Sequence, residues 1–196
     1  MRKLSGLIAL IGLGLLLACW QAPHARAADW KLEPAGSRLE FIATFEKTPA
    51  PGIFKDFNVR LSFDPEQPGS GRLDVTIRVA SADMASADIN TAIAGIEWFD
   101  FARHQQAEFH ASDIRRLPTS PQPNRFVARG TLSLKGVSQA VEVPFSWSPG
   151  TEGASMDGEF NVKRGPFGIG TGEWMVTDVI GADVKVKFRV RLRKAS

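Results

Sequence analysis

The feature that most limits how this chain can fold is a period-two alternation of apolar and polar residues. In its first run, Leu39, Phe41 and Phe45 share one face, whereas Glu40 and Thr44 share the other. Successive side chains of a β-strand point to opposite faces, so this pattern predicts strands buried on one face only. The pattern recurs over residues 57–63, 72–79, 125–135, 141–148, 156–162 and 182–193.

Segments rich in turn-forming residues separate these runs. Pro, Gly, Asn and Asp gather at residues 48–52, 64–71, 118–124, 135–136 and 149–150, and they favour tight connections. With a further strand expected over 107–114, the count reaches about eight. Short connections favour antiparallel neighbours, and such a sheet hides its apolar face by closing into a barrel or folding into a sandwich. The residues therefore predict an all-β domain over 28–196.

One segment, residues 86–104, departs from this pattern. Ile89, Ile93, Ile96 and Phe99 are spaced by three and four, which is typical of a helix. Ser86 or Asp88 is suited to cap its start, and Gly95 weakens it midway, so two short helical pieces are expected, the second over 98–103. An excursion between strands has nowhere to bury its rings except the end of the barrel. We therefore expect Trp98 and Phe99 to plug or line one mouth of the interior.

The first 27 residues have the features of an export signal. Arg2 and Lys3 precede an apolar run over 7–20, and Ala25-Arg26-Ala27 offers a small-residue cleavage site. The run is shorter than the ~20 residues of a spanning helix. We expect a periplasmic protein that begins at Ala28. In an alternative, the stretch ending at Cys19 resembles a bacterial lipobox, which would leave the protein anchored to a membrane through an acylated cysteine.

Charge and cysteine content argue against nucleic-acid binding and against disulfide or thiol chemistry. The leader carries three of the 24 cationic side chains, and the 21 that remain balance 21 acidic ones. A neutral domain gives no support for nucleic-acid binding. Cys19 is the only cysteine and lies in the leader, so the mature domain has neither a disulfide nor thiol chemistry. Its stability must come from an apolar core.

Five stretches of the sequence together resemble the YceI-like family of periplasmic polyisoprenoid-binding proteins. They are Gly52-Ile-Phe54-Lys-Asp-Phe57, Phe63-Asp-Pro-Glu66, Trp98-Phe99-Asp100 with Ala107-Glu-Phe109, Gly130-Thr-Leu-Ser-Leu-Lys-Gly136-Val, and Val162-Lys-Arg164 leading to Phe167-Gly168-Ile169-Gly170. The resemblance covers nearly all of residues 29–193. Three positions depart from the family's usual residues: Gln105 replaces a proline, Met84 a threonine and Asn90 an acid.

The resemblance implies a lipocalin-like barrel that holds a long isoprenoid lipid, of prenyl pyrophosphate or quinone type, without chemistry on the ligand. Burying ~20 prenyl carbons would release roughly 16 kcal/mol, against an association cost of ~4–15 kcal/mol, so no cofactor and no charged anchor are required. Small inward residues such as Ala111, Ala128, Gly130 and Gly158 are expected to leave room. The predicted ligand-binding residues are Phe41, Phe45, Phe54, Phe57, Trp98, Phe99, Phe109, Phe145, Phe160 and Phe167.

The sequence offers no catalytic or metal-binding set. It has neither a Gly-x-Ser-x-Gly motif nor paired carboxylates placed for acid–base work. His104 and His110 are too few for a zinc site unless acids join them. The glycine run at 168–172 lacks the lysine and helix of a phosphate loop and is interpreted as a loop between late strands. We expect a protein that is not an enzyme.

Other interpretations remain open from the residues. The cationic row from Lys185 to Arg193 is expected to be a solvated strand face, although it could meet anionic lipid headgroups. An outer-membrane barrel fits poorly, because the chain has no tyrosine and no recognisable aromatic girdles. A barrel filled by its own side chains, working as a stress-response or interaction module, is the main alternative. The sequence does not distinguish a monomer from a dimer.

Overall fold

Ten strands, one α-helix and four short 3₁₀ helices make up residues 27–117 and 124–195, the part of the chain that this computed structural model describes. The expected export signal with Cys19 and most of the expected turn at 118–124 lie outside these residues. The elements are β1 (Ala28–Phe45), β2 (Thr48–Phe54), β3 (Phe57–Phe63), η1 (Pro68–Ser70), β4 (Arg72–Arg78), η2 (Val79–Ser81), β5 (Ala82–Asp83), α1 (Ala87–Ile93), β6 (Gln106–Arg116), β7 (Arg125–Leu134), β8 (Val137–Pro149), β9 (Gly153–Lys163), η3 (Gly165–Phe167), η4 (Gly172–Met175) and β10 (Asp183–Lys194).

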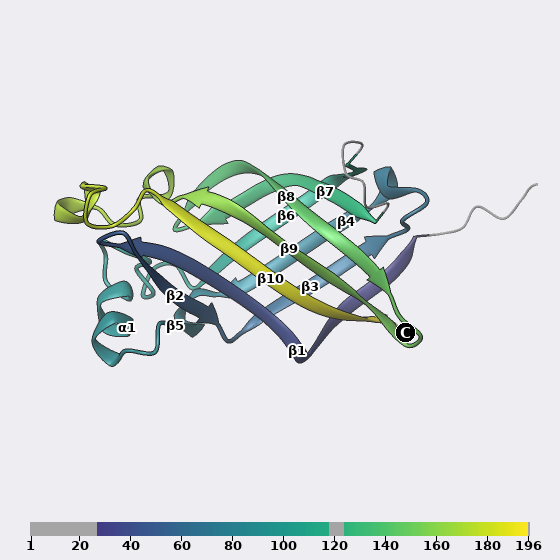
Figure 1. Cartoon of the computed structure of the whole chain (residues 1–196), viewed down its shortest axis with the longest axis horizontal. Helices are drawn as coiled ribbons and strands as arrows, with labels where there is room; N and C mark the ends of the chain where they lie inside the picture. Colours follow the sequence, from purple (N-terminus) through teal and green to yellow (C-terminus); the bar gives the residue numbers. More distant parts are fainter. Residues whose placement is uncertain (1–26, 118–123, 196) are drawn as a thin grey trace, which may run out of the picture.

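Eight of the strands close into an antiparallel barrel. Their order is β10-β9-β8-β7-β6-β4-β3-β1, and pairing of β1 with β10 completes the ring. The predicted fold class is therefore confirmed. The short strands β2 and β5 extend the sheet beyond β1, at the end of the barrel where α1 and the β9–β10 connection also lie (Figure 1). No helix among the described residues is long and apolar enough to cross a membrane.

A bend in β1 allows the barrel to close. Its pairing with β10 shifts register between Glu33 and Arg38, where Gly36 has a φ of +80° that suits glycine. The hydroxyl of Ser37 donates to the Glu33 carbonyl (2.6 Å) and accepts from the Arg191 amide (2.9 Å), which holds the bend against β10. Before the bend β1 pairs with β3, and after it with β2, so one strand serves two neighbours.

Residues 48–52 form the first part of strand β2, so the turn expected there is wrong. The composition of this segment suggested a turn because it contains Pro49 and Pro51, and proline, which lacks an amide hydrogen, is typical of turns. In the structure they occupy alternate positions opposite Thr44 and Ile42 of β1. The other neighbour, β5, pairs with β2 only at Ile53 and Phe54. Proline is tolerated on such an edge because no second strand needs its missing donor.

The excursion contains one helix instead of the two expected. Ser86 caps α1, since its hydroxyl accepts from the amide of Ile89 (3.4 Å). The second piece, 98–103, forms turns. Asp100 has a left-handed φ of 52°, and its amide donates to the Gly95 carbonyl (2.9 Å). A left-handed residue ends regular helical geometry, so this piece cannot continue as a helix.

Candidate functional site

The barrel interior is closed at one end and accessible toward the other. Inward-facing residues follow from the register, because cross-strand partners share a face. On β10, Val190 and Leu192 are buried, whereas Val184, Val186 and Phe188 are half-buried. The same change occurs on β3, β4, β7, β8 and β9, always with the half-buried residues nearer α1. We call these inward half-buried side chains the accessible half of the interior.

Aromatic rings gather where the accessible half meets the end of the barrel. The rings of Phe41 and Phe54 lie 5.0 Å apart between centroids, and Phe99 contacts both at 6.5 and 6.4 Å. Phe99 also stacks on Phe101 at 6.2 Å. Trp98 packs in the same cluster. These rings come from β1, β2 and the segment after α1, so the fold brings distant parts of the sequence to one mouth.

Two loop segments, 94–104 and 164–182, are joined to each other at this end of the barrel (Figure 1), and we call them the lid. The Glu97 carbonyl accepts from the amides of Gly170 (2.7 Å) and Thr171 (3.0 Å), and its carboxylate accepts from the Trp174 indole (3.0 Å). The ammonium of Lys135, in the β7–β8 turn, donates to the carbonyls of Ile96 (2.7 Å) and Gly168 (2.6 Å). Burial lowers the pKa of Lys135.

Arg164 organises the second lid segment from inside. It is 5% exposed, and its guanidinium donates to five backbone carbonyls at 2.6–3.0 Å, those of Ile169, Gly170, Trp174, Ile180 and Gly181. Burial lowers the pKa of this group. An arginine has five N–H donors in a fixed planar fork, so every donor is used on the loop and none is available for a ligand.

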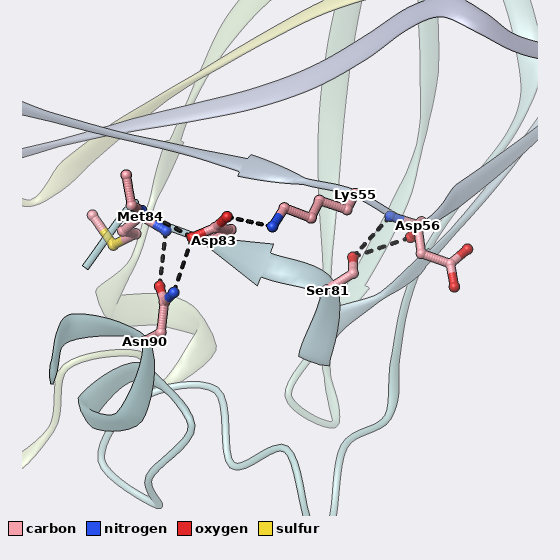
Figure 2. Close-up of polar contacts among 7 residues, drawn as sticks. Lys55, Asp56, Ser81, Asp83, Met84 and Asn90 are labelled. Atoms are coloured by element: carbon pink, nitrogen blue, oxygen red, sulfur yellow. Dashed lines mark hydrogen bonds and ion pairs between the residues drawn. The ribbon is translucent and has the colours of Figure 1, made fainter. Parts of the chain in front are cut away.

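A polar network ties α1 to β5 beside the mouth, as Figure 2 shows. The Asn90 side chain accepts from the Met84 amide (2.8 Å) and donates to the Asp83 carboxylate (2.9 Å). Lys55 lies 2.5 Å from the same carboxylate, and the Ala85 amide donates to it (2.9 Å). Two of the three departures from the family pattern, Met84 and Asn90, therefore contact each other.

The same network predicts a dependence of stability on acid. Lys55, Asn90 and the Ala85 amide hold the pKa of Asp83 well below its usual range. A depressed folded-state pKa stabilises the fold at neutral pH, and this contribution is lost as the pH falls below about 4. We expect Lys55→Met to make urea-unfolding midpoints less sensitive to pH between 7 and 3. Lys31→Met, on the outer face of β1, serves as the control; equal sensitivity in both variants would contradict the assignment.

The predicted site residues divide into three groups. Phe41, Phe54, Trp98 and Phe99 meet at the mouth, and Phe57 and Phe160 are inward and half-buried in the accessible half. Phe109 is 6% exposed on β6, beside this half. The remaining three lie elsewhere: Phe45 is 45% exposed at the tip of β1, Phe145 is buried in the closed half, and Phe167 is buried in η3.

The small inward residues do not leave the room expected of them. A side chain at Gly158 would meet the ring of Phe188 and the carbonyl of Pro144, and one at Gly130 would meet the backbone of His110. Ala111 and Ala128 are 5% and 0% exposed. Neighbouring rings and backbone fill the space beside these residues, so the accessible surface belongs to larger apolar side chains.

Sequence reasoning missed several residues of the site. Phe188 follows the alternation and is inward, and Phe101 and Trp174 add rings to the lid. Trp174 contacts Trp98 at 5.7 Å between centroids. Glu97, Lys135 and Arg164 were not predicted as site residues, although Lys135 and Arg164 stand in the family motifs, because most of their partners are backbone groups from remote segments.

Two depressions flank the second lid segment on the surface. One, of about 200 Å³, is lined by residues that include Arg164, Ile169 and Met175, and the other, of about 430 Å³, by residues that include Lys47 and Asp178. Neither is lined by the accessible half. The apolar interior therefore remains the candidate site.

The cationic row on β10 is largely neutralised by its neighbours. Lys185 and Lys187 lie 3.7 and 3.6 Å from Glu159, and Arg189 lies 2.9 Å from Asp157. These ion pairs make the cationic row a weaker binding surface for anionic headgroups.

The six exposed large apolar side chains of the described residues all lie at the lid end: Phe45, Ile89, Ile96, Met175, Val176 and Val179.

Comparison with known proteins gives consistent matches over most of the chain. The model of the YceI-like domain matches residues 30–192. The crystal structure of BcnA from Burkholderia cenocepacia is similar with a TM-score of 0.77 and 31% identity, covering 82% of this chain and 98% of that one. A polyisoprenoid binding domain from Saccharophagus degradans, implicated in plant cell wall breakdown, has a TM-score of 0.68 at 14% identity, covering 87% and 99%. Protein YceI of Escherichia coli O157:H7 is 25% identical over 174 residues, 83% of this chain and 87% of that protein.

Proposed function

Since this chain belongs to the YceI-like family, as the sequence motifs predict, we propose that it binds the apolar tail of an isoprenoid lipid in the accessible half of its barrel. The observation that carries the proposal is the change from buried to half-buried inward side chains on six strands. Apolar surface that water can reach inside a barrel is favourably covered by an apolar ligand. The relative from Saccharophagus degradans is described as polyisoprenoid binding, which supports this class of ligand.

We further propose that the protein acts in the periplasm as a carrier, without chemistry on its ligand. The apolar leader before Ala28 supports export, and a tail held by apolar side chains can be released unchanged. The headgroup, of pyrophosphate or quinone type, would remain at the mouth beneath the lid. A ligand-free module on the same barrel is the alternative that the first experiment excludes or supports.

The direct test is native mass spectrometry of the protein purified from a bacterial periplasm. We expect a co-purifying isoprenoid that organic solvent extracts and that can be identified by its fragmentation. A protein that carries no lipid, and that binds none when prenyl diphosphates are added, would contradict the proposal and favour the ligand-free module.

A double substitution at the mouth tests the role of the lid rings. We expect Trp98→Ala with Phe99→Ala to weaken prenyl binding at least tenfold, because two large apolar contacts with the ligand are lost. The free energy of ligand binding should change more than the free energy of unfolding does. Titration calorimetry with farnesyl diphosphate measures the affinity. Phe45→Ala is the matched control, since its ring lies exposed at the tip of β1. Equal binding by the double variant and the control would contradict a role for the mouth.

The exposed apolar side chains at the lid end support contact with a membrane surface. An apolar ligand must pass between bilayer and barrel, and Ile96 and Met175, at 63% and 69% exposure, can insert beside the headgroups. We expect Ile96→Glu with Met175→Glu to reduce co-sedimentation with phosphatidylcholine vesicles about tenfold. Thr151→Glu, in the β8–β9 turn, should bind as the unchanged protein does. Loss of binding in both variants would contradict this surface.

A further inference from the structure

We infer that the barrel opens for its ligand by the parting of β8 from β9 at the lid end, and that Lys135 and η3 form the latch that holds these two strands together. This inference rests on the proposed function and deepens it, because it assigns the movement that lets a lipid tail pass. The observation that carries it is an interruption of the strand pairing in the wall of the barrel.

Strands β8 and β9 are paired over only part of their length. Their ladder joins 146–149 to 154–157, at the end of the barrel away from the lid. Toward the lid end (Figure 1), β8 continues over 137–145 and β9 over 158–163, and each stays paired with its other neighbour, β7 or β10. Among the described residues, no ladder pair, side-chain hydrogen bond or ion pair joins these two stretches. We call the boundary between them the seam.

Pro144 explains where the pairing ends. In an antiparallel ladder the N–H and C=O of one residue point to the same neighbouring strand. The Pro144 carbonyl faces β9, since a side chain added at Gly158 would meet it, so the N–H that proline lacks is missing on that side too. Proline is confined to edges and interruptions of a sheet for this reason. On its other side, β8 still pairs with β7 at Val127.

The outward charges beside the seam also bind away from it. Glu142 of β8 lies 2.9 Å from Arg129 of β7. Glu159 of β9 lies 3.7 and 3.6 Å from Lys185 and Lys187 of β10. Parting β8 from β9 at the lid end therefore breaks neither a ladder hydrogen bond nor an ion pair, and water can reach the backbone groups of the exposed residues along both edges.

The rest of the ring is tied more firmly at this end. Ladder pairs reach the lid end between β3 and β4, between β4 and β6, and onward through β6, β7 and β8. They also join β9 to β10 and β10 to β1. The other place where ring neighbours separate, between β1 and β3, is spanned by β2, which pairs along β1, and by β5. The seam is therefore the boundary at which the wall opens most easily.

The latch lies at the lid end of the seam. η3, which follows β9, lies against β8, and its Phe167 is 2% exposed. The ammonium of Lys135, in the turn before β8, donates to the carbonyl of Gly168 (2.6 Å), the residue that ends η3. Its second hydrogen bond, to the Ile96 carbonyl (2.7 Å), ties in the first lid segment. One lysine and one short helix thus join the two strands where the ladder does not.

The seam borders the proposed binding surface. Phe160 and Val162 of β9 are inward and half-buried along it, as is Val141 of β8. When the strands part, the opening at the lid end widens along the seam, and a branched prenyl tail can slide between apolar side chains. When they close, the latch retains the ligand. A gate of this kind changes the rates of entry and exit together and leaves the affinity almost unchanged.

The test locks the seam with a crosslink. Residues 28–196 contain no cysteine, so every thiol in them is an introduced one. Glu142→Cys with Asn161→Cys, two outward positions that would be opposite each other if the β8–β9 register continued, are joined by a short bifunctional thiol reagent. Arg129→Cys with Glu142→Cys, partners in the intact β7–β8 ladder, is the control and receives the same reagent.

Stopped-flow tryptophan fluorescence measures how fast farnesyl diphosphate binds to and leaves the delipidated protein. We expect the seam crosslink to slow both rates about tenfold, with Kd changed less than threefold, and the control crosslink to change either rate less than twofold. Unchanged rates in the fully crosslinked seam, or equal slowing by the control, would overturn the inference while leaving isoprenoid binding intact. Absence of binding in the unmodified protein would overturn both this inference and the proposed function.

A substitution in the latch should act in the opposite direction. Lys135→Met keeps an apolar stem but has no donor, so we expect both rates to rise about fivefold, whereas Lys187→Met, on the outer face of β10, should leave them unchanged. Unchanged rates in Lys135→Met would contradict the latch, whatever the yield of the crosslink. In the seam-crosslinked protein the gain from Lys135→Met should disappear. A gain that persists there would show that this lysine acts through the first lid segment and not through the seam.

Discussion

Replacing Arg164 with alanine is expected to destabilise the protein by about 4 kcal/mol, because hydrogen bonds from a charged donor worth ~1.5–3 kcal/mol each are lost, while water rehydrates most of the carbonyls that the loop then exposes. The five carbonyls that accept from this guanidinium span residues 169–181. Without it the second lid segment has lost its central partner. Urea unfolding should show the lower stability, and the tryptophan emission of the folded variant should shift to the red as Trp174 becomes solvated.

Arg164→Lys separates charge from geometry. Lysine keeps the positive charge but has three donors on a flexible stem, so it cannot reach five carbonyls, and we expect it to recover less than half of the loss. Arg38→Ala, which removes the exposed pair with Glu40, is the control and should change stability by less than ~1 kcal/mol. A fully stable Arg164→Lys would show that charge alone holds the lid.

Phe126→Ala is expected to cost about 4 kcal/mol, within the range for removal of a buried aromatic ring. Phe126 is 0% exposed and contacts Phe63 and Phe145, and the guanidinium of Arg116 lies 5.0 Å from its ring centre. The cavity cannot collapse easily, because the strands around it are fixed by the closed barrel. Chemical denaturation monitored by circular dichroism measures the loss.

Phe45→Ala provides the comparison for this prediction. Phe45 is 45% exposed, so Phe45→Ala should cost less than ~1.5 kcal/mol, because nearly half of the residue's surface stays in water in the folded protein. If Phe126→Ala lowered the free energy of unfolding no more than Phe45→Ala does, the far end of the barrel would be loosely packed.

The alternation along the chain was enough to predict about eight strands buried on one face, because a period of two determines which face of each strand is buried. It left a barrel and a sandwich open, and the family resemblance favoured the barrel. The alternation carries no information about depth along the barrel axis. Phe145 and Phe160 therefore seemed equivalent in sequence, although Phe145 is fully buried in the closed half and Phe160 is half-buried in the accessible half. Trp98 and Phe99 were expected at a mouth because the helical spacing marked an excursion from the sheet, whereas their contact with Phe41 and Phe54 was not predicted.

Other features depend on contacts that form only in the folded chain. Residues 28–37 lack a clean alternation and were not predicted as strand, yet they belong to β1, and residues 28–33 pair with β3 and β10. The left-handed Asp100 ends the predicted second helix, and nothing in its neighbours signals that conformation. The side chains of Lys135 and Arg164 bind main-chain atoms, which every residue possesses, so no spacing of side chains could reveal their roles.

The buried rings of Phe63, Phe126, Phe145 and Trp147 fill the far end of the barrel, so its interior opens only at the lid end. A lipid bound there, as we propose, would enter tail first and leave headgroup first through the same opening. A barrel with one opening gives such transfer no preferred direction. The relative abundance of the lipid in two membranes would then determine which of them gains it.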